Sequence, residues 1–337
     1  MDKKPLIAIT LGDPAGVGPE LVVKAFAEGG LHEFCRPLVV GDAKRLRLAI
    51  EMSNWKLRVN PVSDVKLAKF CPGTVGIIDL ANFPQNQVWG SASAEGGKAS
   101  VEYIQTAADL AMSGVADAIV TTPINKKALW LAGFDWPGHT ELLAEYTESS
   151  GVALMMLGKR LRVTLATLHV PLAEVINFLT QECVEQAIRL THDWLIRYSS
   201  HPPNIAVIGL NPHCGDDGRF GNEENKIIAP AIKQMEEEGV DVRGPFSADA
   251  FFGRGTAYQF AAVVAMYHDQ GLIPLKMEAK GEAVNVTLGI PILRVSVDHG
   301  TAYDIAGHNE ADPKSLIVAL KTATEYATPR ILENEKT

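Results

Sequence analysis

Short apolar runs rich in β-branched residues alternate along this chain with segments in which apolar residues recur every three or four positions. The first pattern is typical of buried strands and the second of amphipathic helices. Their alternation from end to end predicts α/β/α layers built on largely parallel sheets. The expected strands are 6–11, 37–40, 75–80, 116–121, 161–167, 204–210, 261–267 and 292–297, and the expected helices are 19–28, 97–114, 181–200, 222–239 and 312–327.

The length of the chain favours more than one domain, each with its own hydrophobic core. With 337 residues, of which 47% are hydrophobic, two domains are expected. No linker marks a boundary, so the division is inferred from the order of the predicted elements. We expect one domain from 1–135 together with 285–337, and a second from 136–284.

The net charge and the cysteines indicate which partners and which cellular compartment to expect. The net charge is −9 and no basic run offsets it, so nucleic-acid and membrane partners are not expected. No stretch approaches the roughly 18 apolar residues of a membrane span, and the N-terminus lacks a signal-peptide pattern. The cysteines form no C-x-x-C pair, which favours reduced thiols in a cytoplasmic protein. They are Cys35, Cys71, Cys183 and Cys214.

Three histidines follow directly on predicted strands. They are His169, His213 and His268. In an open parallel sheet, ligands bind outside the carboxyl ends of the strands. Three imidazoles at one such edge would form a ligand set that Zn²⁺ accepts while leaving a position open for substrate. Their spacing matches no local metal motif, so hydrogen-bonded loop histidines are the alternative.

Other strand ends and helix starts carry groups suited to an anion. His139 and Thr140 precede a helix, where free N–H groups attract anions, although a simple cap explains Thr140 equally well. Lys276, Asn285 and Arg294 gather near the C-terminus of an otherwise acidic chain. Together these residues predict a pocket for a phosphate or carboxylate.

The stretch GDPAGVGPE, residues 12–20, invites comparison with a dinucleotide-binding turn. That fingerprint requires a small third residue after G-x-G, where helix and strand pack closely. Here Leu21 stands at that place after Gly16 and Gly18, so the fingerprint fails. The stretch instead predicts a flexible loop followed by a helix that begins at Pro19.

Seven stretches together carry a family resemblance. The loop at 12–20 and the one at 298–307 resemble the pair that flanks the cofactor cleft in the isocitrate/isopropylmalate dehydrogenase superfamily. With the remaining stretches, the chain resembles the PdxA family of vitamin B6 biosynthesis over nearly its whole length. In order they are GDPAGVGPE, TTPINK, GHTELLA, LNPHCGDDG, AMYHDQGLIPLK, VNVTLGIP and SVDHGTAYDIAG.

The resemblance implies a role for each matching residue. It assigns the two α/β/α domains to the cofactor side (1–135 plus 285–337) and to metal, substrate and dimerisation (136–284). It implies that one divalent metal is held by His169, His213 and His268, the last from the neighbouring subunit of a homodimer. It also implies substrate binding by His139, Thr140, Lys276, Asn285 and Arg294, catalysis by His139 or Asp249, and cofactor binding by Gly16, Gly18, His299 and Asp304.

The reaction implied is NAD-linked, metal-dependent oxidation of the C3 hydroxyl of 4-hydroxy-L-threonine 4-phosphate, followed by decarboxylation to 3-amino-2-oxopropyl phosphate. This step belongs to pyridoxal 5′-phosphate biosynthesis. Asp304 would favour NAD over NADP, and Zn²⁺ is the expected metal, with Co²⁺ or Mg²⁺ as alternatives. A catabolic 4-phosphoerythronate or 4-phosphothreonate dehydrogenase, a metal hydrolase without nicotinamide and a non-catalytic sensor are the rival functions. Ala250, Cys214, Asp216 and Val295 depart from the family pattern and bear on fine specificity.

Overall fold

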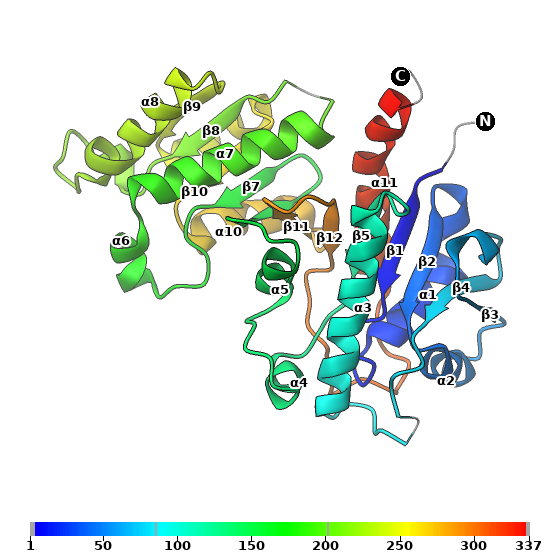
Figure 1. Cartoon of the computed structure of the whole chain (residues 1–337). Coiled ribbons are helices and arrows are strands. Elements are labelled where there is room, and N and C mark those ends of the chain that lie inside the picture. Colours follow the sequence, from blue (N-terminus) through cyan, green and yellow to red (C-terminus); the bar gives the residue numbers. More distant parts are fainter. Residues whose placement is uncertain (1–3, 85, 201, 335–337) are drawn as a thin grey trace. The chain divides into compact units, whose positions relative to one another are not determined.

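The computed structural model describes residues 4–84, 86–200 and 202–334. The chain folds into two compact units (Figure 1). Unit 1 comprises Met1–Ser149 and Ile290–Thr337, and unit 2 comprises Ser150–Gly289. Within the described residues, no helix is both long and apolar enough to cross a membrane.

Unit 1 is built on a parallel sheet in the order β3-β4-β2-β1-β5-β12. Its central strands are buried throughout, because helices cover both faces. The strands are β1 (Leu6–Thr10), β2 (Arg36–Gly41), β3 (Arg58–Val62), β4 (Thr74–Asp79), β5 (Ala118–Thr121) and β12 (Arg294–Ser296).

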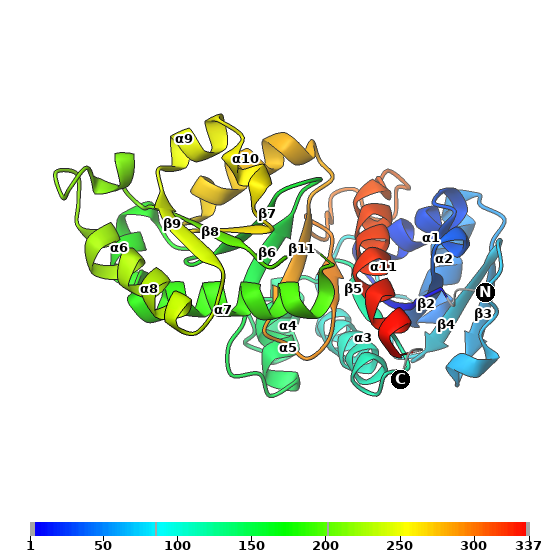
Figure 2. The same ribbon diagram turned by 90° about the horizontal axis from the view of Figure 1, so that it is seen from above.

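The helices of unit 1 lie on both faces of this sheet. Figure 2 shows α1, α2 and α11 on one face and α3 on the other. Side-chain caps begin several helices, among them Asp42 before α2 and Ser93 before α3. The helices are α1 (Gly18–Glu28), α2 (Ala43–Ser53), α3 (Ala94–Met112), α4 (Lys126–Leu131), α5 (His139–Tyr146) and α11 (Lys314–Asn334), with 3₁₀ turns at Leu31–Glu33 and Val65–Leu67.

Unit 2 has a mixed sheet in the order β11-β6-β7-β10-β8-β9. Strands β7, β10, β8 and β9 are parallel, and β6 is antiparallel to both of its neighbours. The strands are β6 (Ala153–Leu157), β7 (Arg162–Leu165), β8 (Ile205–Ile208), β9 (Val242–Phe246), β10 (Ala262–Ala265) and β11 (Val284–Leu288).

The helices of unit 2 again cover two faces. Figure 2 shows α7 and α8 on one side of the sheet and α9 and α10 on the other. They are α6 (Val175–Phe178), α7 (Gln181–Tyr198), α8 (Ala229–Glu237), α9 (Ala248–Gly253) and α10 (His268–Ala279). A π-helical turn, Glu224–Ile228, leads into α8, and 3₁₀ turns occupy Leu172–Glu174, Pro212–Gly215 and Thr256–Gln259.

The expected α/β fold with largely parallel sheets is confirmed. Each of the eight expected strands and five expected helices is present, with ends shifted by at most three residues when the π-helical turn before α8 is included, except that α11 extends to Asn334. Sequence patterns missed β3, β6, β9 and β11. Strands β3 and β9 are sheet edges that contain proline and partly exposed residues, so they lack the continuous apolar run of a buried strand.

The boundaries of the two units differ from the expected ones at both ends of the second domain. Helix α5 belongs to unit 1, because Leu142 and Leu143 are buried and the Tyr146 hydroxyl donates to Asp109 Oδ1 on α3 at 2.8 Å. Residues 285–289 belong to unit 2, because β11 pairs with β6. Neither assignment is visible as a change of composition along the chain.

Candidate active site

The loops at the carboxyl ends of β1, β5 and β12 meet in unit 1. These three strands are neighbours and parallel, so their following loops emerge at one edge. The Asp13 N–H donates to the Pro123 carbonyl at 2.9 Å, and the Val17 N–H donates to the Thr301 carbonyl at 3.1 Å. The Asn125 side chain also donates to Thr301 Oγ1 at 3.3 Å. The two loops expected to flank the cofactor are therefore in direct contact.

Gly16 and Gly18 are required by this contact. A Cβ added to Gly16 would lie 3.0 Å from both the Cβ and the carbonyl oxygen of Thr301. A Cβ added to Gly18 would overlap the Leu11 carbonyl oxygen and lie 2.8 Å from Thr122 Oγ1. The absence of side chains lets α1 begin tightly against β1 and against the loop at 298–307.

Asp13 is fully buried where these loops join. Its carboxylate accepts hydrogen bonds from the Tyr303 hydroxyl at 2.5 Å and from the Ala15 N–H at 2.8 Å. Burial raises the pKa of Asp13 despite these bonds and the nearby Arg45 charge. The pair Asp13–Tyr303 links two segments almost the whole chain apart in sequence.

A third loop, after β4, was missed by the sequence analysis. The Gly90 N–H donates to the Ala15 carbonyl at 2.8 Å, and the guanidinium of Arg45 lies 3.3 Å from the centre of the Trp89 ring. Arg45 Nε also donates to the Pro14 carbonyl at 2.6 Å. Burial lowers the pKa of Arg45 to about 10. The sequence could have indicated this loop, because it follows a predicted parallel strand and therefore lies at the same sheet edge as the other loops.

His139 and Arg294 form a second polar group in unit 1. Arg294 is buried and donates from Nε and Nη2 to Thr121 Oγ1, at 3.1 and 2.8 Å. His139 begins α5, and its Nε2 is buried without a hydrogen-bond partner in the described structure. Thr140 follows in the first turn, half-buried.

The electrostatics of this pair favour an anionic ligand. Burial lowers the pKa of Arg294 to about 9, and the Glu141 carboxylate opposes that shift. Burial, followed by the Arg294 charge, holds the pKa of His139 well below its ordinary value. At neutral pH, the charge of a buried guanidinium therefore acts on a neutral imidazole, and an anion would relieve the cost of burying that cation.

His299 and Asp304, the other expected cofactor residues, are exposed on the loop at 298–307. His299 Nδ1 lies 3.0 Å from the Gly300 carbonyl oxygen. Both side chains face solvent, while the backbone of the loop is held by Thr301 and Tyr303.

In unit 2, the three histidines follow β7, β8 and β10, which are neighbouring parallel strands. The His169 and His268 rings have centroids 5.7 Å apart, and a pocket of about 270 Å³ is lined by both. His213 lines a second pocket of about 590 Å³ together with Asp249. Tyr267 and Asp269 line both pockets, so the two are adjacent.

Two of the three histidines expected to bind a metal lie close together. Two close imidazoles fit the chemistry of Zn²⁺ or Co²⁺ ligands. Among the described residues, however, no three His, Cys, Asp or Glu side chains are grouped closely enough to hold a metal ion. Within the chain, the His268 ring lies beside that of His169, because β7 and β10 end side by side. The contribution of His268 to the site of a neighbouring subunit stays a prediction.

The loop that carries His213 is conformationally unusual. His213, Cys214 and Asp216 have φ values of 54°, 55° and 45°, in the left-handed region. Such conformations are disfavoured for these residue types and persist where surrounding contacts hold them. Buried Glu224 does so here, accepting from the Asn211 N–H at 2.7 Å and from Asn211 Nδ2 at 3.0 Å. No motif or spacing in the sequence indicated that Glu224 holds this loop.

Gln270 joins two of the strand ends in unit 2. Its Oε1 accepts from the Met266 N–H at 2.8 Å, and its Nε2 donates to the Gly209 carbonyl at 2.7 Å. This amide fixes the start of α10 between β10 and β8. His268, the first residue of that helix, is positioned as a result, with its Nδ1 2.8 Å from Asp269 Oδ1.

The remaining expected residues are distributed over both units. Asp249 is exposed on α9, and a 2.6 Å hydrogen bond from the Ser247 hydroxyl lowers its pKa, aided by the Ala250 N–H. Lys276 is exposed on α10, and Asn285 is half-buried on β11. Of the substrate-binding set, these last two belong to unit 2, while His139, Thr140 and Arg294 belong to unit 1.

The fold and its polar strand ends define the class of α/β enzymes that bind ligands at the carboxyl edges of parallel sheets. The chain belongs to the PdxA family: the family model described as "Pyridoxal phosphate biosynthetic protein PdxA" matches residues 33–323. The resemblance drawn from the seven stretches is thereby confirmed.

Relatives match over nearly the whole chain. A 4-hydroxythreonine-4-phosphate dehydrogenase of Desulforapulum autotrophicum is 47% identical over 97% of both chains. A D-threonate 4-phosphate dehydrogenase of Cupriavidus necator is 42% identical, covering 98% of this chain and 99% of its own. The crystal structure of a 4-hydroxythreonine-4-phosphate dehydrogenase from Klebsiella pneumoniae has a TM-score of 0.91 at 40% identity, covering 96% of this chain and 98% of that one.

Proposed function

We propose that this protein oxidises the C3 hydroxyl of 4-hydroxy-L-threonine 4-phosphate, using NAD and a divalent metal. The C3–H leaves as hydride to NAD⁺ and the hydroxyl loses a proton, which gives NADH and a 3-oxo acid. The bond from C2 to the carboxylate then breaks with loss of CO₂, and protonation at C2 gives 3-amino-2-oxopropyl phosphate. The observation that carries this proposal is the buried Arg294–His139 pair at a strand edge of a PdxA-family chain.

The chain's own residues would bind and orient the substrate. Arg294 provides a buried cation and α5 provides free N–H groups, both suited to a phosphate or carboxylate. Holding the anion away from C3 orients the reacting carbon. Thr140, Lys276 and Asn285 are the further substrate contacts that we propose.

His139 and Asp249 are the two candidates for the proton acceptor. Both have lowered pKa values, the first through burial and the second through the Ser247 hydrogen bond, so both are unprotonated at neutral pH. The pH profiles of kcat for His139→Asn and Asp249→Asn distinguish them. Loss of the acidic limb in one variant identifies the acceptor.

His169, His213 and His268 would hold the metal. When bound, a divalent cation supplies a Lewis acid that lowers the pKa of the substrate hydroxyl. Imidazole donors favour Zn²⁺ or Co²⁺ over Mg²⁺. The cofactor would lie against the loops 12–18, 87–90 and 298–307, with Gly16 and Gly18 allowing their close packing, His299 near the adenine and the Asp304 carboxylate repelling the 2′-phosphate of NADP.

A second copy of the chain would cover the histidine pockets in a homodimer with a shared active site. Leu172, Ile176 and Phe178 are 70%, 54% and 56% exposed near the His169 pocket. Ile273 and Met277, which line the His213 pocket, are 57% and 73% exposed. Apolar side chains gathered around an incomplete donor set favour burial by a partner.

Mixing experiments test the shared site. If the metal ligands come from two chains, inactive His169→Asn and inactive His268→Asn proteins regain activity in hybrid dimers. If all the ligands come from one chain, every hybrid site lacks one donor and activity stays absent. Sedimentation velocity gives the oligomeric state of each sample.

A D-threonate 4-phosphate dehydrogenase is the second candidate, favoured by the identity with the Cupriavidus necator relative. The two substrates differ at C2, where one carries an ammonium group and the other a hydroxyl. Comparing kcat/KM for both, by NADH absorbance, decides between them.

The free thiols of all four cysteines fit action in the cytoplasm.

Chelation tests the metal. Dialysis against a chelator should abolish NADH formation, and Zn²⁺ or Co²⁺ should restore it. Full activity in protein shown by elemental analysis to be free of metal would overturn the metal mechanism, while substrate consumption without NADH would indicate a hydrolase or lyase.

A further inference from the structure

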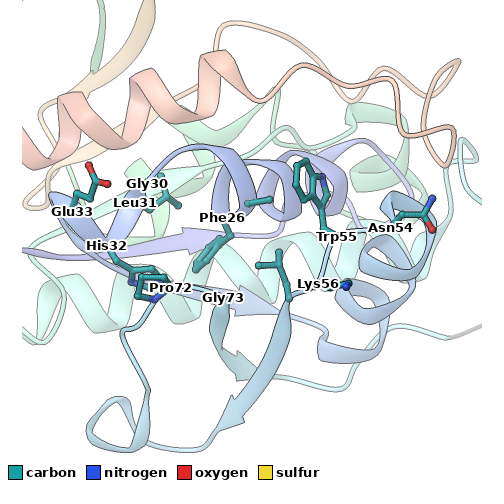
Figure 3. A pocket seen from close by; sticks show the side chains of 12 residues that line it. Phe26, Gly30, Leu31, His32, Glu33, Asn54, Trp55, Lys56, Pro72 and Gly73 are labelled. Carbon is teal, nitrogen blue, oxygen red and sulfur yellow. The ribbon is translucent and has the colours of Figure 1, made fainter.

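A pocket of about 580 Å³ lies in unit 1, away from the loops described above (Figure 3). It is lined by the end of α1, the turn at 30–33, the link between α2 and β3, and Pro72–Gly73 just before β4. These segments precede β2, β3 and β4, so the pocket is at the amino edge of the parallel sheet. Five-residue strands place that edge about 16 Å from the carboxyl edge.

The floor of this pocket is apolar and aromatic. Phe26 and Leu31 are buried beneath it, and the Phe26 ring meets His32 edge-on with centroids 5.8 Å apart. Trp55 leaves 40% of its surface exposed although it lines the pocket. In Figure 3, Trp55 and Lys56 lie toward one end and His32 and Pro72 toward the other, with the Phe26 ring between them. A flat ring would find an aromatic surface here.

Three consecutive side chains at the rim offer unused donors. Asn54 adopts the left-handed conformation at the end of α2, with φ 58°, and turns the chain toward the pocket. Within the described residues, the Asn54 amide, the Trp55 indole N–H and the Lys56 ammonium make no hydrogen bond or ion pair with other side chains or backbone. An ammonium and an indole N–H beside an aromatic floor suit an anion attached to a ring.

We propose that this pocket binds a small planar aromatic anion, a ring bearing a phosphate or carboxylate group. The ring stacks on Trp55 above Phe26, and the anionic group meets Lys56 and the Asn54 amide. Glu33, at the turn that begins with Gly30, limits the anion to the Lys56 end. This site does not depend on the proposed dehydrogenase activity, and its test needs no turnover.

Calorimetric titration of the full chain, with NAD present at saturation, tests the proposal. Phenyl phosphate is the probe, with phenol as the ring lacking the anion and inorganic phosphate as the anion lacking the ring. We expect phenyl phosphate to bind at least tenfold more tightly than either. Equal affinity for phenol or for inorganic phosphate would overturn the proposal.

Variants locate the binding. Trp55→Ala and Lys56→Met should each weaken phenyl phosphate binding at least tenfold, while Trp55→Phe and Lys56→Arg should largely retain it. Trp130→Ala is the matched control, because Trp130 is an exposed tryptophan on α4 outside the pocket. Both target side chains are exposed, so the variants should fold, and their melting temperatures verify this. Unchanged affinity in Trp55→Ala and Lys56→Met would place the ligand elsewhere and refute the site.

Discussion

The carboxyl edges of the two sheets are built differently. In unit 1, Asp13, Arg45 and Arg294 are buried, and their hydrogen bonds tie three loops and a helix start into one body. In unit 2, His169 and His213 are exposed, and the close ring contact there is between His169 and His268. The first edge is held together by buried hydrogen bonds within the chain, while the second presents exposed imidazole side chains.

This difference has an energetic basis. Buried polar groups that lose a partner are costly, so the hydrogen bonds of the unit 1 edge contribute directly to the stability of the fold. An exposed side chain such as His213 is solvated by water, so a lost hydrogen bond costs less there. We therefore expect substitutions in the unit 1 edge to affect stability first and those in the unit 2 edge to affect activity first.

The largest expected effect is on activity, in unit 2. Replacing His213 with Asn keeps a residue that tolerates its left-handed backbone. We expect kcat to fall by more than about 100-fold, because even outer partners of a metal site cost ten- to a hundredfold. NADH formation, metal content and melting temperature are measured together. A variant with unchanged kcat and metal content would remove His213 from the proposed metal site.

The next effect is on stability, in unit 1. Gly18→Ala should lower the free energy of unfolding by about 1–3 kcal/mol, because its Cβ would overlap the Leu11 carbonyl oxygen. Gly253→Ala is the matched control in unit 2, where nothing lies within 4 Å of the added carbon. Urea unfolding of both variants compares the two units. Equal stability of the two variants would contradict the tight packing at the start of α1.

A smaller effect concerns pH. Because burial holds the pKa of His139 below 6.5, the folded protein binds fewer protons than the unfolded chain as pH falls below that value. This contribution to stability is present above pH 6.5 and is lost progressively below it. In His139→Asn, the free energy of unfolding should depend less on pH in that range. Parallel pH curves for the two proteins would show that His139 does not titrate in this way.

The smallest effect is on cofactor choice. Asp304 is exposed, and exposed charge interactions are worth at most about 1 kcal/mol. Asp304→Ser should therefore raise kcat/KM for NADP by roughly two- to fivefold, with kcat/KM for NAD changed less. Initial rates with each cofactor measure the ratio. A ratio identical to that of the parent protein would mean that Asp304 lies away from the 2′ position.

Much of the fold was predictable, because buried strands appear in the sequence as apolar runs and amphipathic helices as apolar residues every three or four positions. The buried runs of β1, β5 and β10 were found for this reason, while the edge strand β3, with Pro61 and partly exposed residues, was not. Strand ends led to the three histidines and a predicted helix start led to His139, whereas Asp249 came only from the family resemblance. Arg45, Trp89 and Glu224 were missed, because their partners are distant in sequence and no spacing connects them.

The sequence by itself determined the family, the α/β class and the residues at each strand end. These depend on local periodicity and on motifs that occur in a fixed order along the chain. Tertiary structure decided which of those residues touch. Only folding brings Asp13 to Tyr303, buries Arg294 where its charge acts on His139, and leaves His213 apart from the His169–His268 pair. The physical reason is that burial and hydrogen bonding between distant segments depend on strand order, and neighbours along the chain do not encode that order.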